Sequence, residues 1–233
     1  ATQAHVGDID LSPYVSPHSL QIGPDGLLYI TCENSGVVAL VDLQERAVAG
    51  AIETGSTNAH RLTFAPDGRH LFTENEEDAS IAVIDVSARK LVRHIAMPHP
   101  LAGIAASPDG KLLVATDDEE PTIYLIDTGT LEIVKSVRLD GVPEPGQIVR
   151  FSPDGAVVLV TSMRSGTATL IDPTFTQQTT LSVGKQPMDG AFRASLLLVG
   201  CQGDGSIHVI DLAKRQVLTN FAAGVGCETL AFF

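Results

Sequence analysis

The chain has 233 residues, of which 44% are hydrophobic and only 18% are charged. This composition is too apolar for a disordered chain and allows a sizeable buried core. The net charge of −13 argues against nucleic acid or an anionic membrane surface as partner, because phosphate binding needs a basic stripe. Apolar runs reach only about five residues, so the sequence predicts no membrane span. The acidic balance suits a cationic or metal ligand, although solubility alone also explains it.

The start of the chain and its cysteines do not determine the compartment. The sequence begins at Ala1 without a basic and then apolar leader, as a mature secreted protein or a trimmed chain would. We expect a periplasmic or secreted location in preference to a cytoplasmic one. Cys32, Cys201 and Cys227 are an odd set that cannot form a complete disulfide framework, and we expect them to be small buried hydrophobic residues.

A repeat of 42 to 45 residues organises the chain. A Pro-Asp-Gly turn recurs four times, with its aspartate at Asp25, Asp67, Asp109 and Asp154. An apolar pair followed by aspartate recurs five times, at Asp42, Asp85, Asp127, Asp172 and Asp211. A fifth unit lacks the turn, but residues 196–212 still align with 27–43 without a gap. We therefore divide one domain, 1–233, into five complete repeats, at about 17–58, 59–100, 101–145, 146–186 and 187–226.

Each repeat predicts four short strands. In the second repeat these are residues 59–65, 69–73, 80–86 and 91–96, separated by turn residues. No stretch of about 10 or more residues combines a sustained helical period with capping residues. Four strands in each repeat predict an all-β fold, a β-propeller of four-stranded antiparallel blades, with a solenoid of hairpins as the alternative.

The two ends predict parts of a further blade. Residues 3–11 resemble a fourth, outer strand, and residues 227–233 resemble a first, inner strand. A sixth blade built from both ends would lack its two middle strands. We expect a fragment of, or an incomplete, six- or seven-bladed ring, with self-association through the open ends or closure by a partner as alternatives.

The turn and strand motifs resemble a known repeat. Phe64-Ala65-Pro66-Asp67-Gly68 and Ala82-Val83-Ile84-Asp85 are similar to the YVTN-type β-propeller repeat, and the resemblance covers nearly the whole chain. Related propellers include lactonases of the 6-phosphogluconolactonase type, large subunits of quinoprotein amine dehydrogenases and surface-layer-associated proteins. The resemblance implies the fold, but it implies little about function because many functions share this scaffold.

Alignment of the first four repeats on the turns, and of the last two units on their phenylalanines, places one residue of each at a common channel mouth. These residues are His18, His60, Ala102, Gln147, Met188 and Glu228. In a six-bladed ring Glu228, His18 and His60 would be neighbours, and two imidazoles with a carboxylate suit Zn, Fe or Mn. A polar channel lining, or simple duplication of one repeat, would explain the histidines equally well, and a seventh blade would separate Glu228 from His18.

A second group of polar residues falls on the same face. Thr31-Cys32-Glu33-Asn34 aligns with Thr73-Glu74-Asn75-Glu76, and the third repeat adds residues 117–120, all acidic. Glu33, Asn34, Glu74 and Asn75 are oxygen ligands of the kind Ca²⁺ takes, and calcium-dependent propeller lactonases use Glu and Asn at a channel mouth. Solvated loop charge is the simpler explanation. Arg164 on the matching loop could orient an anionic substrate group, or be an ordinary surface arginine.

Two functions follow from these residues. The first is a small-molecule site at the channel mouth, a metal-dependent hydrolase or lyase in which His18, His60 and Glu228 hold the metal and Glu74 is the general base. Gln147, Glu33, Asn34, Asn75 and Arg164 would contact the ligand. The second is a non-catalytic scaffold that binds protein or glycan, although the scarcity of aromatic residues weakens it. A redox accessory subunit is a third alternative, without a haem or quinone motif to favour it.

Overall fold

The computed structural model describes residues 5–230, which form five separate four-stranded antiparallel sheets in the order of the sequence. The first blade contains β1 (Pro17–Ile22), β2 (Leu28–Cys32), β3 (Val37–Asp42) and β4 (Ala47–Glu53), with a 3₁₀ turn, η1 (Glu33–Ser35), after β2. The second contains β5 (Ala59–Phe64), β6 (His70–Asn75), β7 (Ser80–Asp85) and β8 (Lys90–Ala96). The third contains β9 (Leu101–Ala106), β10 (Leu112–Asp117), β11 (Thr122–Asp127) and β12 (Glu132–Arg138).

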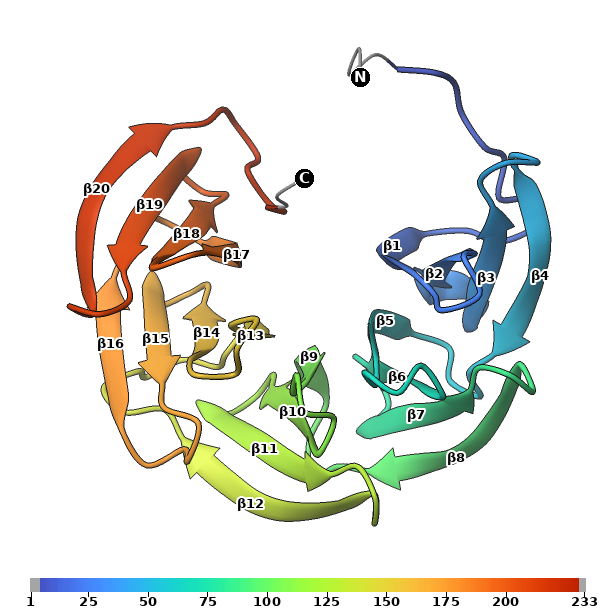
Figure 1. Cartoon of the computed structure of the whole chain (residues 1–233), viewed down its shortest axis with the longest axis horizontal. Coiled ribbons are helices and arrows are strands. Elements are labelled where there is room, and N and C mark those ends of the chain that lie inside the picture. Colours follow the sequence, from blue (N-terminus) through green and yellow to red (C-terminus); the bar gives the residue numbers. More distant parts are fainter. Residues whose placement is uncertain (1–4, 231–233) are drawn as a thin grey trace.

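The fourth blade contains β13 (Ile148–Phe151), β14 (Val158–Ser162), β15 (Thr167–Ile171) and β16 (Gln178–Ser182). The fifth contains β17 (Pro187–Arg193), β18 (Leu196–Cys201), β19 (Ser206–Asp211) and β20 (Gln216–Ala222). The first strand of each blade is innermost, and the blades follow one another around an incomplete ring (Figure 1). The all-β partial propeller that the repeat predicts is confirmed, and each sheet lies within one predicted repeat. Among residues 5–230, no helix has the length and apolar character that crossing a membrane requires.

The two repeated motifs each make one kind of turn. The Pro-Asp-Gly turn joins the first and second strands, and Gly68 has the positive φ, +68°, that such a turn needs. A Cβ on Gly68 would lie only 3.2 Å from Pro24 Cβ, so successive turns pack against each other. The second marker joins the third and fourth strands. Asp85, for example, accepts a hydrogen bond from the Ala88 N–H at 2.8 Å, which caps the hairpin.

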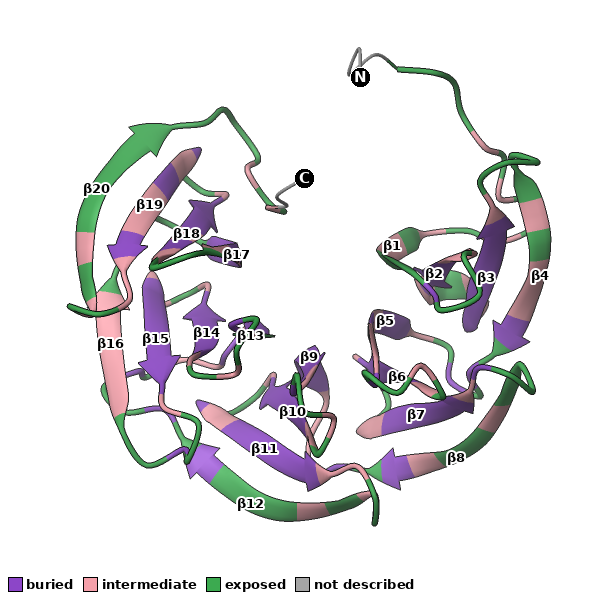
Figure 2. Cartoon of the chain, in the orientation of Figure 1, coloured by how far each residue is buried: buried purple, intermediate pink, exposed green. Residues whose placement is uncertain are grey.

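The core lies between blades. Each of four apolar clusters joins two neighbouring blades, as Phe72 of β6 and Leu113 of β10 do between blades two and three. The middle strands and the inner strands of blades two to five are mostly buried, whereas β1 and the fourth strands are mostly exposed or partly exposed (Figure 2). This pattern places the polar residues of the first strands around a central channel, which is where a site can form.

Blade one differs from blade two by one residue in its first turn. The Gly23 N–H bonds the Leu27 carbonyl, whereas the Ala65 N–H reaches one residue further, to His70. Leu20 pairs with Ile30 in blade one, and Leu62 pairs with Thr73 in blade two. The second strand of blade two is therefore shifted by one residue relative to that of blade one.

The shorter turn corrects our alignment of residues 31–34 with 73–76, which is wrong by one position. Thr31 is structurally equivalent to Glu74, and Glu33 is equivalent to Glu76. Sequence alignment missed this because the Pro-Asp-Gly motif is itself ungapped, and the additional residue follows it.

The end segments pack on the outermost blades without forming strands within the described residues. Ile9, Leu11 and Tyr14 pack against the apolar cluster on the open face of blade one. Cys227 and Leu230 lie over Gly200 of blade five, where a Cβ would meet Cys227 Sγ at 3.2 Å. Residues 3–4 and 231–233 of the expected extra blade lie outside the described residues.

Candidate functional site

The candidate site lies at the channel mouth on blades one and two. His18 stands near the start of β1 and His60 near the start of β5, and both strands have an irregularity in register at this point. The loops after β2 and β6 reach the same end of their blades and bring carboxylates to the histidines. Local chain geometry thus gathers residues that are 42 positions apart in the sequence.

The two imidazoles are stacked and each is held by one ring nitrogen. Their ring centroids are 4.0 Å apart. His18 Nδ1 donates to the His60 carbonyl oxygen at 3.2 Å, and that carbonyl also accepts the Thr31 hydroxyl at 2.7 Å. Because a carbonyl only accepts, Nδ1 of His18 carries the proton and Nε2 of the neutral ring keeps its lone pair.

His60 is oriented by Glu74, whose side chain is completely buried. His60 Nδ1 lies 2.7 Å from Glu74 Oε1, which also accepts the Arg61 N–H at 3.2 Å. Glu74 Oε2 has no hydrogen-bond partner among the described residues. Burial raises the pKa of Glu74 to about 8, against the lowering effect of the Arg61 charge. This carboxyl has no access to the channel and acts on it only through His60.

Two further carboxylates face the other nitrogen of His60. Its Nε2 lies 3.8 Å from Glu33 Oε1 and 3.9 Å from Glu76 Oε1. Ligating atoms of His18, Glu33 and His60 all lie within 4.8 Å of one another, a spacing that could hold a metal ion. Burial lowers the pKa of both histidines, so the rings are neutral at pH 7 and able to act as ligands.

The third predicted metal ligand, Glu228, lies elsewhere on the channel. It is exposed and lines the central space together with His18, but it is not part of the His18, Glu33 and His60 cluster. The carboxylate in that cluster is Glu33, which we expected only as a ligand contact. The spacing of the repeats identified the histidines, but it could not show which loop carboxylate reaches them.

Two arginines line the channel beside His18. The central space has a volume of about 500 Å³ and includes His18, Arg61, Arg150 and Met188 in its lining. Arg61 Nε donates to the Ala102 carbonyl at 2.8 Å, and no hydrogen bond from its terminal nitrogens is found among the described residues.

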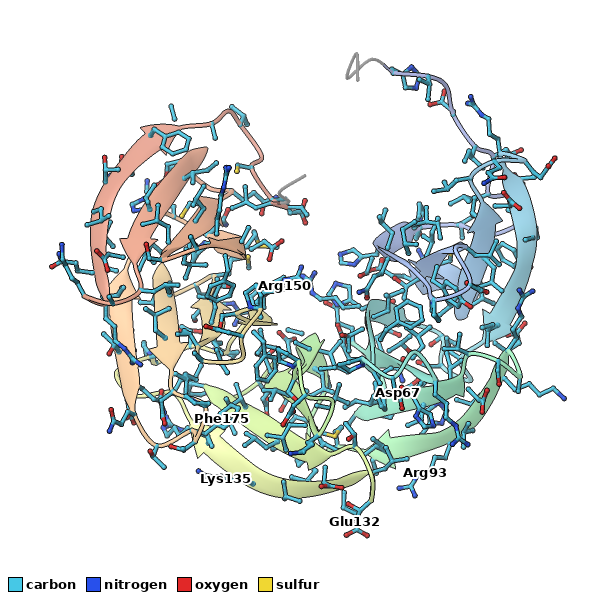
Figure 3. All side chains as sticks on the ribbon, in the orientation of Figure 1. Asp67, Arg93, Glu132, Lys135, Arg150 and Phe175 are labelled. Atoms are coloured by element: carbon cyan, nitrogen blue, oxygen red, sulfur yellow. The ribbon has the colours of Figure 1, made fainter. Side chains whose placement is uncertain are left out.

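Arg150 reaches from β13 toward the centre of the ring (Figure 3). It pairs in a bidentate manner with the buried Asp189, at 3.0 and 3.3 Å. Neither Arg61 nor Arg150 was predicted from the sequence as a channel residue. The signal was available, since each is a cation on a first strand near the position used to define the mouth.

The remaining predicted contacts are dispersed. Asn34 Nδ2 donates to Ser16 Oγ, in the segment before β1, at 2.5 Å, and buried Asn75 donates to Ser80 Oγ, at the start of β7, at 2.7 Å. Arg164 forms an exposed ion pair with Glu144 at 3.7 Å. Gln147 precedes β13, and its backbone N–H bonds the Thr161 carbonyl.

A second histidine and carboxylate pair stands on blade three. His99 Nδ1 lies 2.7 Å from Asp117 Oδ2, and this hydrogen bond raises the pKa of His99. The Tyr124 hydroxyl donates to the same oxygen at 2.6 Å. Asp117 is completely buried and also accepts the Glu119 and Glu120 N–H groups, so it holds the loop after β10, while the His99 side chain is 38% exposed.

Comparison with known proteins identifies the family. Residues 22–215 match the Cytochrome D1 heme domain family. The chain belongs to this family. The structure is similar to a chain from Kuenenia stuttgartiensis hydrazine synthase, with a TM-score of 0.69 and 16% identity over 97% of this chain and 91% of that one. At this identity the likeness shows the fold alone. No curated protein sequence matches the chain significantly.

The family match agrees with the predicted fold, but the family is not the one that the turn motifs resemble. Both indicate a propeller, but the match does not show the YVTN-type repeat that the turn motifs resemble. Haem proteins hold iron through an imidazole nitrogen, and a tetrapyrrole also carries carboxylates. The channel offers groups of both kinds, namely the Nε2 lone pair of His18 and the guanidinium of Arg61. The donor set of the channel therefore fits a haem-type cofactor.

Proposed function

We propose that the protein binds a tetrapyrrole-type cofactor in its central channel. The observation that carries this proposal is the family match over residues 22–215, supported by an imidazole and two guanidinium groups that line one space. A bound haem would supply an iron with an open coordination position for small ligands. His18 would ligate through Nε2, since its Nδ1 is already engaged by a carbonyl.

Arg61 has the role of pairing with a cofactor carboxylate. It is only partly exposed, makes no direct ion pair among the described residues, and lies beside Arg150 on the channel wall. A charge-assisted hydrogen bond to such an arginine contributes about 1.5–3 kcal/mol. Arg150 already has Asp189 as partner, so Arg61 is the arginine whose loss should matter more.

The test is titration of the purified protein with hemin, followed by its Soret absorbance. We expect saturable binding at one equivalent, weakened at least tenfold in His18→Ala and about tenfold or more in Arg61→Gln. His5→Ala, which removes an exposed histidine on the N-terminal segment, is the matched control and should bind like wild type. The proposal fails if wild type gives no saturable shift, or if His18→Ala and Arg61→Gln bind hemin as tightly as wild type.

A metal-dependent hydrolase or lyase, lactonase-like in our sequence-based expectation, is the second candidate. One observation favours it, the convergence of His18, Glu33 and His60 within 4.8 Å. A cation there would acidify a bound water. Glu76 would be the base in this function, because its side chain is 39% exposed whereas Glu74 is fully buried. Hydrolysis of chromogenic esters and lactones with added Zn²⁺ or Mn²⁺, abolished in Glu76→Gln, would support it, and absence of turnover in wild type would exclude these substrates.

Three sequence-based expectations stay predictions. Self-association through the open ends would appear as a concentration-dependent mass in light scattering. A periplasmic or secreted location would appear on fractionation of the native host. The third expectation is a non-catalytic scaffold that binds protein or glycan, and no observation on residues 5–230 favours it.

A further inference from the structure

Three side chains, His18, Glu33 and His60, lie close together at the mouth, and a fourth, Glu76, approaches His60. Glu33 and Glu76 lie at equivalent positions of blades one and two, and each places an oxygen within 3.9 Å of His60 Nε2. Ligating atoms of His18, Glu33 and His60 lie within 4.8 Å of one another. A cation bound at 2.0–2.2 Å brings its ligands to roughly 3–3.6 Å from one another. Closing this cluster needs side-chain movements of about 1 Å or less, and the partly exposed Glu33 and Glu76 are free to make them.

Both imidazoles already present the correct nitrogen. Nδ1 of His18 donates to a carbonyl, and Nδ1 of His60 donates to Glu74 Oε1, which also accepts the Arg61 N–H, so a proton held by this carboxyl is placed on Oε2. The Nε2 lone pairs consequently remain for a ligand. In the absence of a cation, the lone pair of His60 faces two carboxylate oxygens, an arrangement that a positive charge between them would stabilise.

Glu74 is an independent observation that points to a ligand. The equivalent positions of three other blades hold Thr31, Thr116 and Thr161, each of which forms a hydrogen bond with a first-strand backbone group. Only blade two replaces this threonine by a carboxyl, which is completely buried and leaves Oε2 without a partner among the described residues. Burying a carboxyl in this way is costly. A carboxylate behind the Nδ1–H of an imidazole is the usual support of a metal-bound histidine.

We propose that His18, His60 and Glu33 bind a divalent transition-metal cation, with Glu76 beside it as the base of the second candidate function and Glu74 as the positioning residue for His60. Two nitrogens with carboxylate oxygens favour Zn²⁺, Fe²⁺, Mn²⁺ or Co²⁺ over Ca²⁺ and Mg²⁺, which take oxygen ligands. This site shares His18 with the proposed tetrapyrrole function, but it requires no tetrapyrrole. It identifies the ligand class of the second candidate function.

The test is isothermal titration of chelator-treated full-length protein with Zn²⁺, and with Co²⁺ followed by its visible absorption. We expect one equivalent to bind wild type, with affinity reduced at least tenfold in Glu33→Gln and in His18→Ala. Glu74→Gln should lose roughly 10–100-fold, and its Co²⁺ spectrum should change because the His60 ring is released. Glu77→Gln, which neutralises an exposed carboxyl on the same loop as Glu76, is the matched control.

The outcomes separate this site from the proposed tetrapyrrole site. Glu33→Gln should weaken Zn²⁺ and leave hemin binding unchanged, whereas Arg61→Gln should weaken hemin and leave Zn²⁺ binding unchanged. The cation site is overturned if wild type binds neither Zn²⁺ nor Co²⁺ stoichiometrically. It is also overturned if Glu33→Gln and His18→Ala bind Zn²⁺ as tightly as wild type does. Both conclusions hold whether or not hemin binds. Hemin binding that fails while Zn²⁺ binds overturns only the tetrapyrrole proposal.

Discussion

Replacement of Glu74 by glutamine should change how stability depends on pH. The folded-state pKa of Glu74 is about 8, against an ordinary value of 4.5, because the side chain is fully buried. The folded chain therefore holds a proton that the unfolded chain releases above pH 4.5. The stability contribution is fully present below about pH 4.5 and is lost as the pH rises towards 8. Each pH unit costs at most about 1.4 kcal/mol and less near either pKa, so wild type should lose about 3.5 kcal/mol between pH 5 and pH 8 through this group.

Glutamine removes that dependence but introduces a constant cost. Its amide oxygen can accept the same two hydrogen bonds. Its amide NH₂ group takes the position of Oε2, where it has no partner, and burying this donor costs about 1–3 kcal/mol of folding stability. Glu74→Gln should therefore be less stable than wild type at pH 5 and equally or more stable at pH 8.

The assay is urea unfolding followed by circular dichroism at pH 5, 6, 7 and 8 with EDTA present. Glu77→Gln, on the exposed part of the same loop, is the control and should follow the wild-type profile. A difference between Glu74→Gln and wild type that stays constant within about 1 kcal/mol over this range would show that burial does not hold the proton on Glu74.

Three further substitutions test the packing, each by its shift in urea midpoint. Gly103→Ala should destabilise the protein by about 1–3 kcal/mol, because its Cβ would lie 2.7 Å from the Gln147 carbonyl oxygen of blade four. Gly129→Ala, on an exposed turn, is the control and should cost less than about 1 kcal/mol. Equal effects of the two substitutions would contradict this close approach. Phe72→Ala should cost about 3–5 kcal/mol because the ring is completely buried between blades two and three, and a loss below 1 kcal/mol would be inconsistent with that position. Tyr124→Phe should cost about 1 kcal/mol by removing the 2.6 Å hydrogen bond to Asp117, and no loss would show that Asp117 does not need this donor.

The repeat was enough to predict the blades because its turn chemistry is local. Pro-Asp-Gly and the hairpin aspartates set backbone angles within a few residues, and each sheet then follows from the short strands between them. The length of a turn is equally local but less visible. The additional residue after Gly68 carries no signature, and it shifted our alignment of the second strand by one position.

The site was predictable only in part because it depends on contacts between blades. Equivalent positions identified His18 and His60, since repeats place such residues at one level of the channel. Sequence spacing could not show that Glu33 replaces Glu228 beside them, because that depends on how the loop after β2 is oriented. It also could not separate Glu74, which is buried, from Glu76, which is partly exposed, because the two would share one face of a strand and the sequence does not show that β6 ends between them, at Asn75.

The irregular register at the start of the inner strands has a consequence for how this protein can change. In β1, β5 and β17 the regular ladder skips the residue at the mouth, so pairing of the first two strands does not involve its side chain. Histidine, alanine, glutamine and methionine all occupy this level in different blades of one chain. A substitution there alters the chemistry of the channel at little cost to the sheet. Each blade is thus a separate place at which one substitution can change the groups that line the channel.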